Sequence, residues 1–186
     1  MKKMILAAAL SLMCTAAFAQ KFAHLNSQEV FQLMPEMDDV RAKVAKISKD
    51  NEEVLKSMYD EFQTKYQAYQ QKAATWTDAV RETKEKELTV LENNIRESQQ
   101  SLQQEIQTIQ NNLTAPVVKK FQETLAEIGK KGGYIYIFDS STALYIDPAQ
   151  STDITAEVRK ALNIPEGRTL ETLQQELQAQ QAAAQE

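Results

Sequence analysis

The chain has 186 residues, 26 acidic and 21 basic side chains, and a formal net charge of −5. Such an acidic chain lacks the basic surface of a nucleic-acid-binding protein, so we expect no nucleic-acid partner. Only four glycines and four prolines occur, while Gln, Glu, Lys, Ala and Leu are abundant, and this composition favours long helices over a compact globular domain.

Residues 1–19 have the pattern of a secretory signal peptide. Two lysines at 2–3 precede a short apolar run at 4–13, and a small-x-small cleavage site follows at 17–19. The apolar run is shorter than the ~20 residues that a membrane-spanning helix needs. We therefore expect an exported protein whose mature chain begins at Gln20.

Residues 20–35 predict a strand followed by a short helix. Alternating side chains over 21–26 form a weak strand pattern. Ser27 is the predicted N-cap of the helix, because its hydroxyl can accept a hydrogen bond from a free backbone N–H of the first turn. The helix is expected to end near Pro35.

Residues 36–131 predict two long helices with matching heptad seams, because apolar residues recur at alternating spacings of four and three. The first helix is expected over 36–72, with one polar break at Asn51. The second is expected over 79–128. Its seam comprises Leu88, Leu91, Ile95, Ser98, Leu102, Ile106, Ile109, Leu113, Val117, Phe121, Leu125 and Ile128.

The turn between the two helices is expected at 73–79, where Thr75, Thr77 and Asp78 can each cap a helix start. Neither glycine nor proline marks this position, so a single continuous helix is an alternative on pattern alone. Further along, Pro116 is expected to kink the second helix. Glycines 129, 132 and 133 are expected to end it.

Residues 132–163 predict a β-hairpin and a helix. The β-rich runs 134–138 and 143–146 are separated by turn residues at 139–142. Asp153 is expected to cap a helix over 154–162 that presents Ile154, Val158, Ala161 and Leu162 to the sheet. Residues 164–186 are rich in Gln and Ala and favour a flexible tail over a weak amphipathic helix through Leu170, Leu173 and Leu177.

The predicted fold class is therefore α+β. The N-terminal strand and the C-terminal β-hairpin form one small sheet, and the long antiparallel coiled-coil hairpin projects from it as an arm. An isolated hairpin buries little apolar surface, so partner copies are expected. The candidate oligomer body comprises Phe22, Leu25, Ile135, Ile137, Leu144 and Ile146.

We expect no enzymatic activity, cofactor or metal. The single cysteine, Cys14, leaves with the signal peptide, so the mature chain has no thiol for catalysis, disulfides or metal binding. Its only histidine, His24, lies on a predicted strand without a nucleophile beside it. The sequence contains no phosphate-binding loop and no nucleophile elbow.

One broad aromatic stripe follows helical spacing near the expected tip of the arm: Tyr59, Phe62, Tyr66, Tyr69 and Trp76. Such a stripe fits the core of the hairpin. It also fits a partly exposed surface that grips apolar segments of an unfolded client protein. The two interpretations are compatible, because the middle three residues fit the seam better than the outer two.

The two ends of the mature chain resemble the OmpH/Skp family. Residues 21–31 are similar to that family's opening strand and helix, and residues 133–139, 143–148 and 153–155 to its closing strands and helix. The resemblance covers Lys21 to about Leu162. It implies a periplasmic homotrimer whose helical arms hold unfolded outer-membrane proteins without ATP.

The acidic charge departs from the strongly basic arms of well-known members of this family. Once Lys2 and Lys3 are removed with the signal peptide, the net charge becomes −7. Contact with membranes or lipopolysaccharide is therefore left open. The alternative function is a structural coiled-coil spacer or assembly factor of the cell envelope, which would not suppress aggregation of a client.

Overall fold

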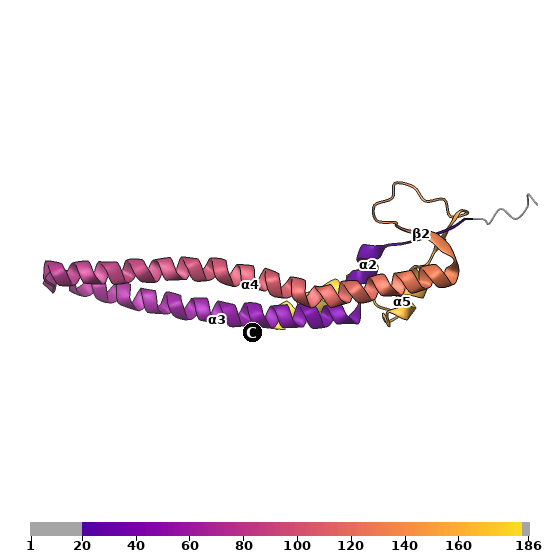
Figure 1. Ribbon diagram of the computed structural model, residues 1–186. Coiled ribbons are helices and arrows are strands. Elements are labelled where there is room, and N and C mark those ends of the chain that lie inside the picture. The colour runs from indigo at the N-terminus through magenta and orange to yellow at the C-terminus, as the bar shows by residue number, and fades with distance from the viewer. Residues whose placement is uncertain (1–19, 184–186) are drawn as a thin grey trace, which may run out of the picture. The chain divides into compact units, whose positions relative to one another are not determined.

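A computed structural model describes residues 20–183, and the expected signal peptide lies outside the described residues. The chain divides into two compact units (Figure 1). The hairpin unit comprises residues 35–120. The sheet unit comprises residues 20–34 and 121–183, so the chain leaves it after the first segment and returns to it after the helical excursion.

The hairpin unit is built from α3 (Pro35–Lys72), the 3-10 turn η1 (Ala73–Thr75) and the first part of α4 (Asp78–Gly132). The two helices are antiparallel, because their cross-pairs converge toward the turn. Glu36 pairs with Lys120, and Gln99 Nε2 donates to Tyr59 Oη at 2.8 Å. Nearest the turn, Tyr69 donates to Glu85. The helical hairpin is confirmed, and a single continuous helix is excluded.

The predicted seam of α4 is buried or half-buried at every position. On α3, the predicted seam residues Val54 and Tyr66 are exposed, while Leu55, next to Val54, is half-buried. A straight helix drifts relative to a strict heptad repeat, and this drift moves the contact line by one residue. At the polar break, Asn51 Nδ2 is buried without a hydrogen-bond partner in the described part of the chain.

The end of α4 corrects the predicted boundary. The helix runs through Pro116 and through Gly129 to Gly132. Of these three glycines only Gly133 has a positive φ, of 68°, a conformation that strains any residue with a side chain, and it ends the helix. A Cβ atom on Gly132 would lie 2.2 Å from the ring of Tyr134, so a larger residue there would displace this ring.

The sheet unit contains three parallel strands in the order β2-β1-β3: β1 is Lys21–Leu25, β2 is Tyr134–Asp139 and β3 is Ser151–Asp153. The predicted β-hairpin is therefore wrong. Residues 143–146 form no strand, although their residue types favour one. Ser140 N donates to Leu25 O at 2.8 Å, and the chain then loops to the other edge of β1 instead of doubling back along β2.

The sheet unit is completed by the last part of α4 (residues 121–132) and by three shorter helices, α2 (Ser27–Gln32), α5 (Thr155–Ala161) and α6 (Leu170–Ala183). Asn26, not Ser27, caps α2, because its Oδ1 accepts from Glu29 N at 3.0 Å. Ile154, not Asp153, is the N-cap residue of α5, and it makes no side-chain cap hydrogen bond; Asp153 Oδ1 accepts from Thr155 N at 2.8 Å in the turn before the helix. The buried core residues of this unit are Ala23, Leu25, Val30, Leu33, Met34, Phe121, Ile128, Ile154, Val158, Leu162, Ile164 and Leu173.

Two expectations for the C-terminal region need correction. Ala161 is exposed, because Ile154, Val158 and Leu162 already complete the buried side of α5. Residues 170–183 form helix α6 where a flexible tail was expected. Thr169 and Thr172 cap its start reciprocally, and Leu173 is buried, so a capped first turn and one apolar anchor give this Gln-rich segment a defined conformation.

Asp139 joins the end of β2 to the start of α2. Its carboxylate accepts from the Ser27 hydroxyl at 2.5 Å and backbone N–H at 3.3 Å, and from Ser141 N at 3.0 Å. The hydrogen bond from the Ser27 side chain is the main reason why the pKa of Asp139 falls to about 2. The Ser27 hydroxyl, which was expected to cap α2, thus connects two segments that are 112 residues apart in the sequence.

We expect Asp139→Asn to lower the free energy of unfolding by about 1 kcal/mol at neutral pH, because a neutral amide is a weaker acceptor for these donors. The folded-state pKa lies below the ordinary value of 3.8, so this contribution is complete above about pH 4 and is lost toward pH 2. Urea unfolding at pH 7, 4 and 2 measures it. Asp60→Asn, which alters an exposed carboxylate on α3, is the control. An equal difference between Asp139→Asn and the parent at all three pH values would contradict the assignment.

Candidate binding surfaces

The tip of the hairpin is fixed by Arg81. Its guanidinium donates to the carbonyl oxygens of Ala73 and Trp76 at 3.3 and 3.5 Å, and it lies 3.3 Å from the Asp78 carboxylate. These carbonyls belong to the 3-10 turn and to the residue after it, where the ends of two helices leave backbone groups without helical partners. The Arg81 side chain, on the first turn of α4, therefore supplies hydrogen-bond donors to two backbone carbonyl groups in the turn that joins the helices.

The structure divides the aromatic stripe into two pairs and one single residue. Phe62 and Tyr66 stack with their ring centroids 5.9 Å apart. Tyr69 and Trp76 meet edge to face at the same separation. Tyr59 and Tyr66 are exposed, whereas the other three are half-buried. The stripe thus supplies both hairpin core and surface.

Three hollows follow the seam between α3 and α4 near the tip. One is lined by Tyr59, Phe62, Ile95 and the polar groups of Glu92, Arg96 and Gln99. A second has Met58, Val90 and Leu91 between charged walls that include Glu61, Lys65, Lys86 and Glu87. The third lies at Tyr69 and Trp76. Sequence analysis missed Val90, which is 58% exposed, because it lies one position outside the heptad seam.

The sheet has a buried face and an open aromatic face. Ala23 and Leu25 are buried on one side of β1. On the other side, Phe22 stacks with Tyr136 and contacts Phe138, with ring centroids 6.4 and 6.0 Å apart. Successive side chains of a strand point to opposite faces of the sheet. Phe22 and Leu25, both expected in the oligomer body, are three residues apart and therefore lie on opposite faces.

The other expected oligomer-body residues differ in exposure. Ile135 and Leu144 are exposed, the latter fully, whereas Ile137 and Ile146 are half-buried. An apolar hollow lies between the loop and the sheet, lined mainly by Phe22, Phe138, Ala143, Tyr145 and Ile146. Strand β2 pairs only with β1, so its other edge has no strand beside it in the described chain.

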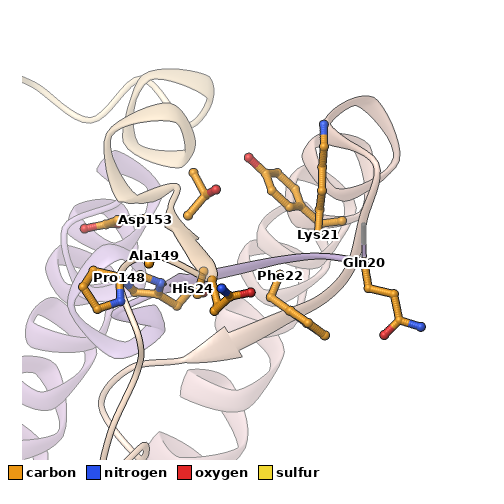
Figure 2. A pocket seen from close by; sticks show the side chains of 11 residues that line it. Gln20, Lys21, Phe22, His24, Pro148, Ala149 and Asp153 are labelled. Atoms are coloured by element: carbon orange, nitrogen blue, oxygen red, sulfur yellow. Dashed lines mark hydrogen bonds between the residues drawn. The ribbon is translucent and has the colours of Figure 1, made fainter. Parts of the chain in front are cut away.

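His24 lies in a separate hollow at the edge of β3, whose lining Figure 2 shows. Its Nδ1 is 2.8 Å from Ser151 Oγ on the paired strand. Burial alone would raise the pKa of the adjacent Asp153, but hydrogen bonds from Thr155 hold it below its ordinary value. These contacts connect β1 to β3 and to the start of α5, which is a structural use of the histidine.

Within residues 20–183, no cluster of three or more His, Cys, Asp or Glu side chains has a geometry suited to a metal ion. No helix in the same range is both long enough and apolar enough to cross a membrane. What the structure offers is a set of shallow apolar hollows along a two-helix hairpin, together with an open aromatic sheet face. These features are those of a protein that binds other polypeptides.

The family model described as outer membrane protein (OmpH-like) matches residues 21–162. The chaperone protein Skp of Yersinia enterocolitica is 29% identical over 163 residues, which covers 86% of this chain and 98% of that protein. Skp of Pectobacterium atrosepticum is 27% identical over 164 residues, with the same coverage. The chain therefore belongs to the OmpH-like family of chaperones, which confirms the resemblance seen in its sequence.

A solved structure from Caulobacter crescentus, described as an OmpH-like outer membrane chaperone, has the same fold. It superposes with a TM-score of 0.67 over 77% of this chain and 84% of that one, at 17% identity. The matched family region ends at residue 162, so α6 lies beyond it.

We expect Arg81→Lys to loosen the tip while leaving the rest of the hairpin folded, because an ammonium cannot reach two carbonyls and a carboxylate with the fixed fork of a guanidinium. The emission of Trp76 should shift to longer wavelength, and the melting temperature should fall by a few degrees. Arg96→Lys, which alters an exposed pair with Glu92 on the same helix, is the control. An unchanged emission spectrum in Arg81→Lys would contradict this role.

Proposed function

We propose that this protein is a periplasmic, ATP-independent holdase that binds unfolded outer-membrane proteins and keeps them from aggregating. The observation that carries the proposal is the set of large apolar side chains left exposed along the hairpin in a member of a chaperone family. They are Val54, Tyr59, Tyr66, Val80, Val90 and Val118.

Two helices can bury only the sides that face each other, so the outer apolar residues remain available to a client. Each one offers a small contact area of low affinity. Several such contacts along one arm, and on more than one arm, raise the effective affinity while each contact remains easily broken. Binding of the unfolded client lowers its free concentration, which slows aggregation without any energy-consuming step.

The proposed assembly is a homotrimer held by the sheet units. The free edge of β2 and the aromatic face of Phe22, Tyr136 and Phe138 are unsuited to solvent in a monomer. Residues 143–146 have strand-forming side chains but no strand partner within the described chain. A neighbouring copy could supply that partner, and the three arms would then surround a shared space.

The function is tested with a urea-unfolded outer-membrane β-barrel protein diluted into buffer with and without this protein. We expect light scattering from aggregated client to fall with increasing chaperone in the absence of nucleotide, at micromolar concentration or below. Size-exclusion chromatography should show a discrete complex of client and chaperone. A stable oligomer that leaves aggregation unchanged would support the envelope spacer instead.

The assembly is tested with Ile135→Asp. This side chain is 51% exposed on β2, so the monomer should keep its fold while the charge disrupts contact between copies. We expect the solution mass from light scattering to fall from three chains to one, with an unchanged circular dichroism spectrum. Val90→Asp on the hairpin is the control and should remain trimeric. If Ile135→Asp keeps the parent mass, β2 does not hold the oligomer.

A further inference from the structure

The hollow at the tip has an apolar floor built by helical spacing. On α3, Ala68 and Tyr69 lie between Lys65 and Lys72, two turns apart on one side of the helix. On α4, Leu88 follows Lys84 by one turn, and Trp76 closes the hollow from the turn region. The hollow measures about 170 Å³, which is below the ~300–1,000 Å³ of typical small-molecule sites.

The floor is held in place before any partner binds. Trp76 meets Tyr69 edge to face at 5.9 Å, and its carbonyl accepts from Arg81. Tyr69 in turn donates to Glu85, and that hydrogen bond is the main cause of the raised pKa of the phenol. A preorganised aromatic floor loses little conformational entropy when an apolar side chain enters.

The rim of this hollow is basic, although the chain as a whole is acidic. Three lysines and one glutamate line it. Lys84 is paired with Glu87 at 2.9 Å, and Lys65 with Glu61 at 2.7 Å. Lys72 is exposed and belongs to none of the ion pairs described within residues 20–183, so its ammonium is open to a carboxylate of a partner.

We propose that the tip hollow is a binding site for an extended peptide segment in which an aromatic or branched apolar side chain lies next to a carboxylate. The apolar side chain occupies the floor between Trp76 and Leu88, and the carboxylate pairs with Lys72. This inference rests on the proposed chaperone function and names the client segment that one part of the hairpin selects.

A peptide fits this site better than a lipid surface does. The hollow has room for one side chain, not for an acyl chain. Asp78 and Glu82 lie close to the tip as well, and an anionic membrane would meet these carboxylates together with the lysines. A short peptide segment can meet the rim alone and avoid them.

The test uses the fluorescence of Trp76, the only tryptophan in the chain, in the purified full-length protein. Three blocked tetrapeptides are titrated: Gly-Phe-Asp-Gly, Gly-Phe-Lys-Gly and Gly-Ala-Asp-Gly. We expect only the first to shift the emission, with a dissociation constant of ~1 mM, since the contact area is small. Raising the salt concentration should weaken this binding.

Lys72→Gln should weaken binding of Gly-Phe-Asp-Gly by about 2- to 5-fold, the size of one exposed charge pair. The control Lys56→Gln, which alters an exposed lysine of the same helix outside the hollow, should bind as the parent does. Equal responses to the three peptides, or an unchanged affinity in Lys72→Gln, would overturn the proposal. So would a response to phosphatidylglycerol vesicles but not to peptide.

Failure of this proposal is distinguishable from failure of the proposed function. If the parent suppresses aggregation of the β-barrel client but the peptides bind without charge preference, the holdase stands and the tip site does not. If the parent binds Gly-Phe-Asp-Gly selectively yet leaves the client to aggregate, the site stands as a peptide site and the holdase does not.

Discussion

The central strand of the sheet can be paired only after the chain has completed its helical excursion. β1 lies between β2 and β3, and both of these come from the C-terminal third of the chain. The sheet unit therefore depends on α3 and α4 returning the chain to its starting point. The antiparallel pairing of the two long helices is for this reason a condition for the sheet as well as for the arm.

The hairpin also shows how a small number of helices creates a binding surface. A bundle of three or four helices would cover the residues beside the seam, whereas two helices leave them in solvent. Val90 is an example, because it is exposed beside the half-buried seam residue Leu91 without being part of the seam. Exposure of apolar groups thus follows from the architecture and requires no special motif.

Much of this fold could be predicted from local patterns in the sequence. The heptad seam of α4 and the turn at 73–79 depend on interactions between residues close in sequence or directly across the hairpin. The β-hairpin prediction failed because strand propensity at 143–146 says nothing about which strand is the partner. The prediction that Ser27 caps α2 failed for a related reason. Its hydroxyl donates to Asp139, which is 112 residues away, and local sequence does not show so distant a partner. In the candidate site, the aromatic residues could be found from their spacing, but their separation into two pairs could not.

Asn51 interrupts the apolar contact between α3 and α4 with a buried amide nitrogen that has no hydrogen-bond partner in the described chain. A buried donor in this state costs about 1–3 kcal/mol, so the layer around it contributes less to holding the helices together than its neighbours do. Local opening of the helices is cheapest at such a layer, and amide hydrogen exchange should be faster there than on either side. The hairpin is consequently two stiffer segments separated by a softer layer at Asn51.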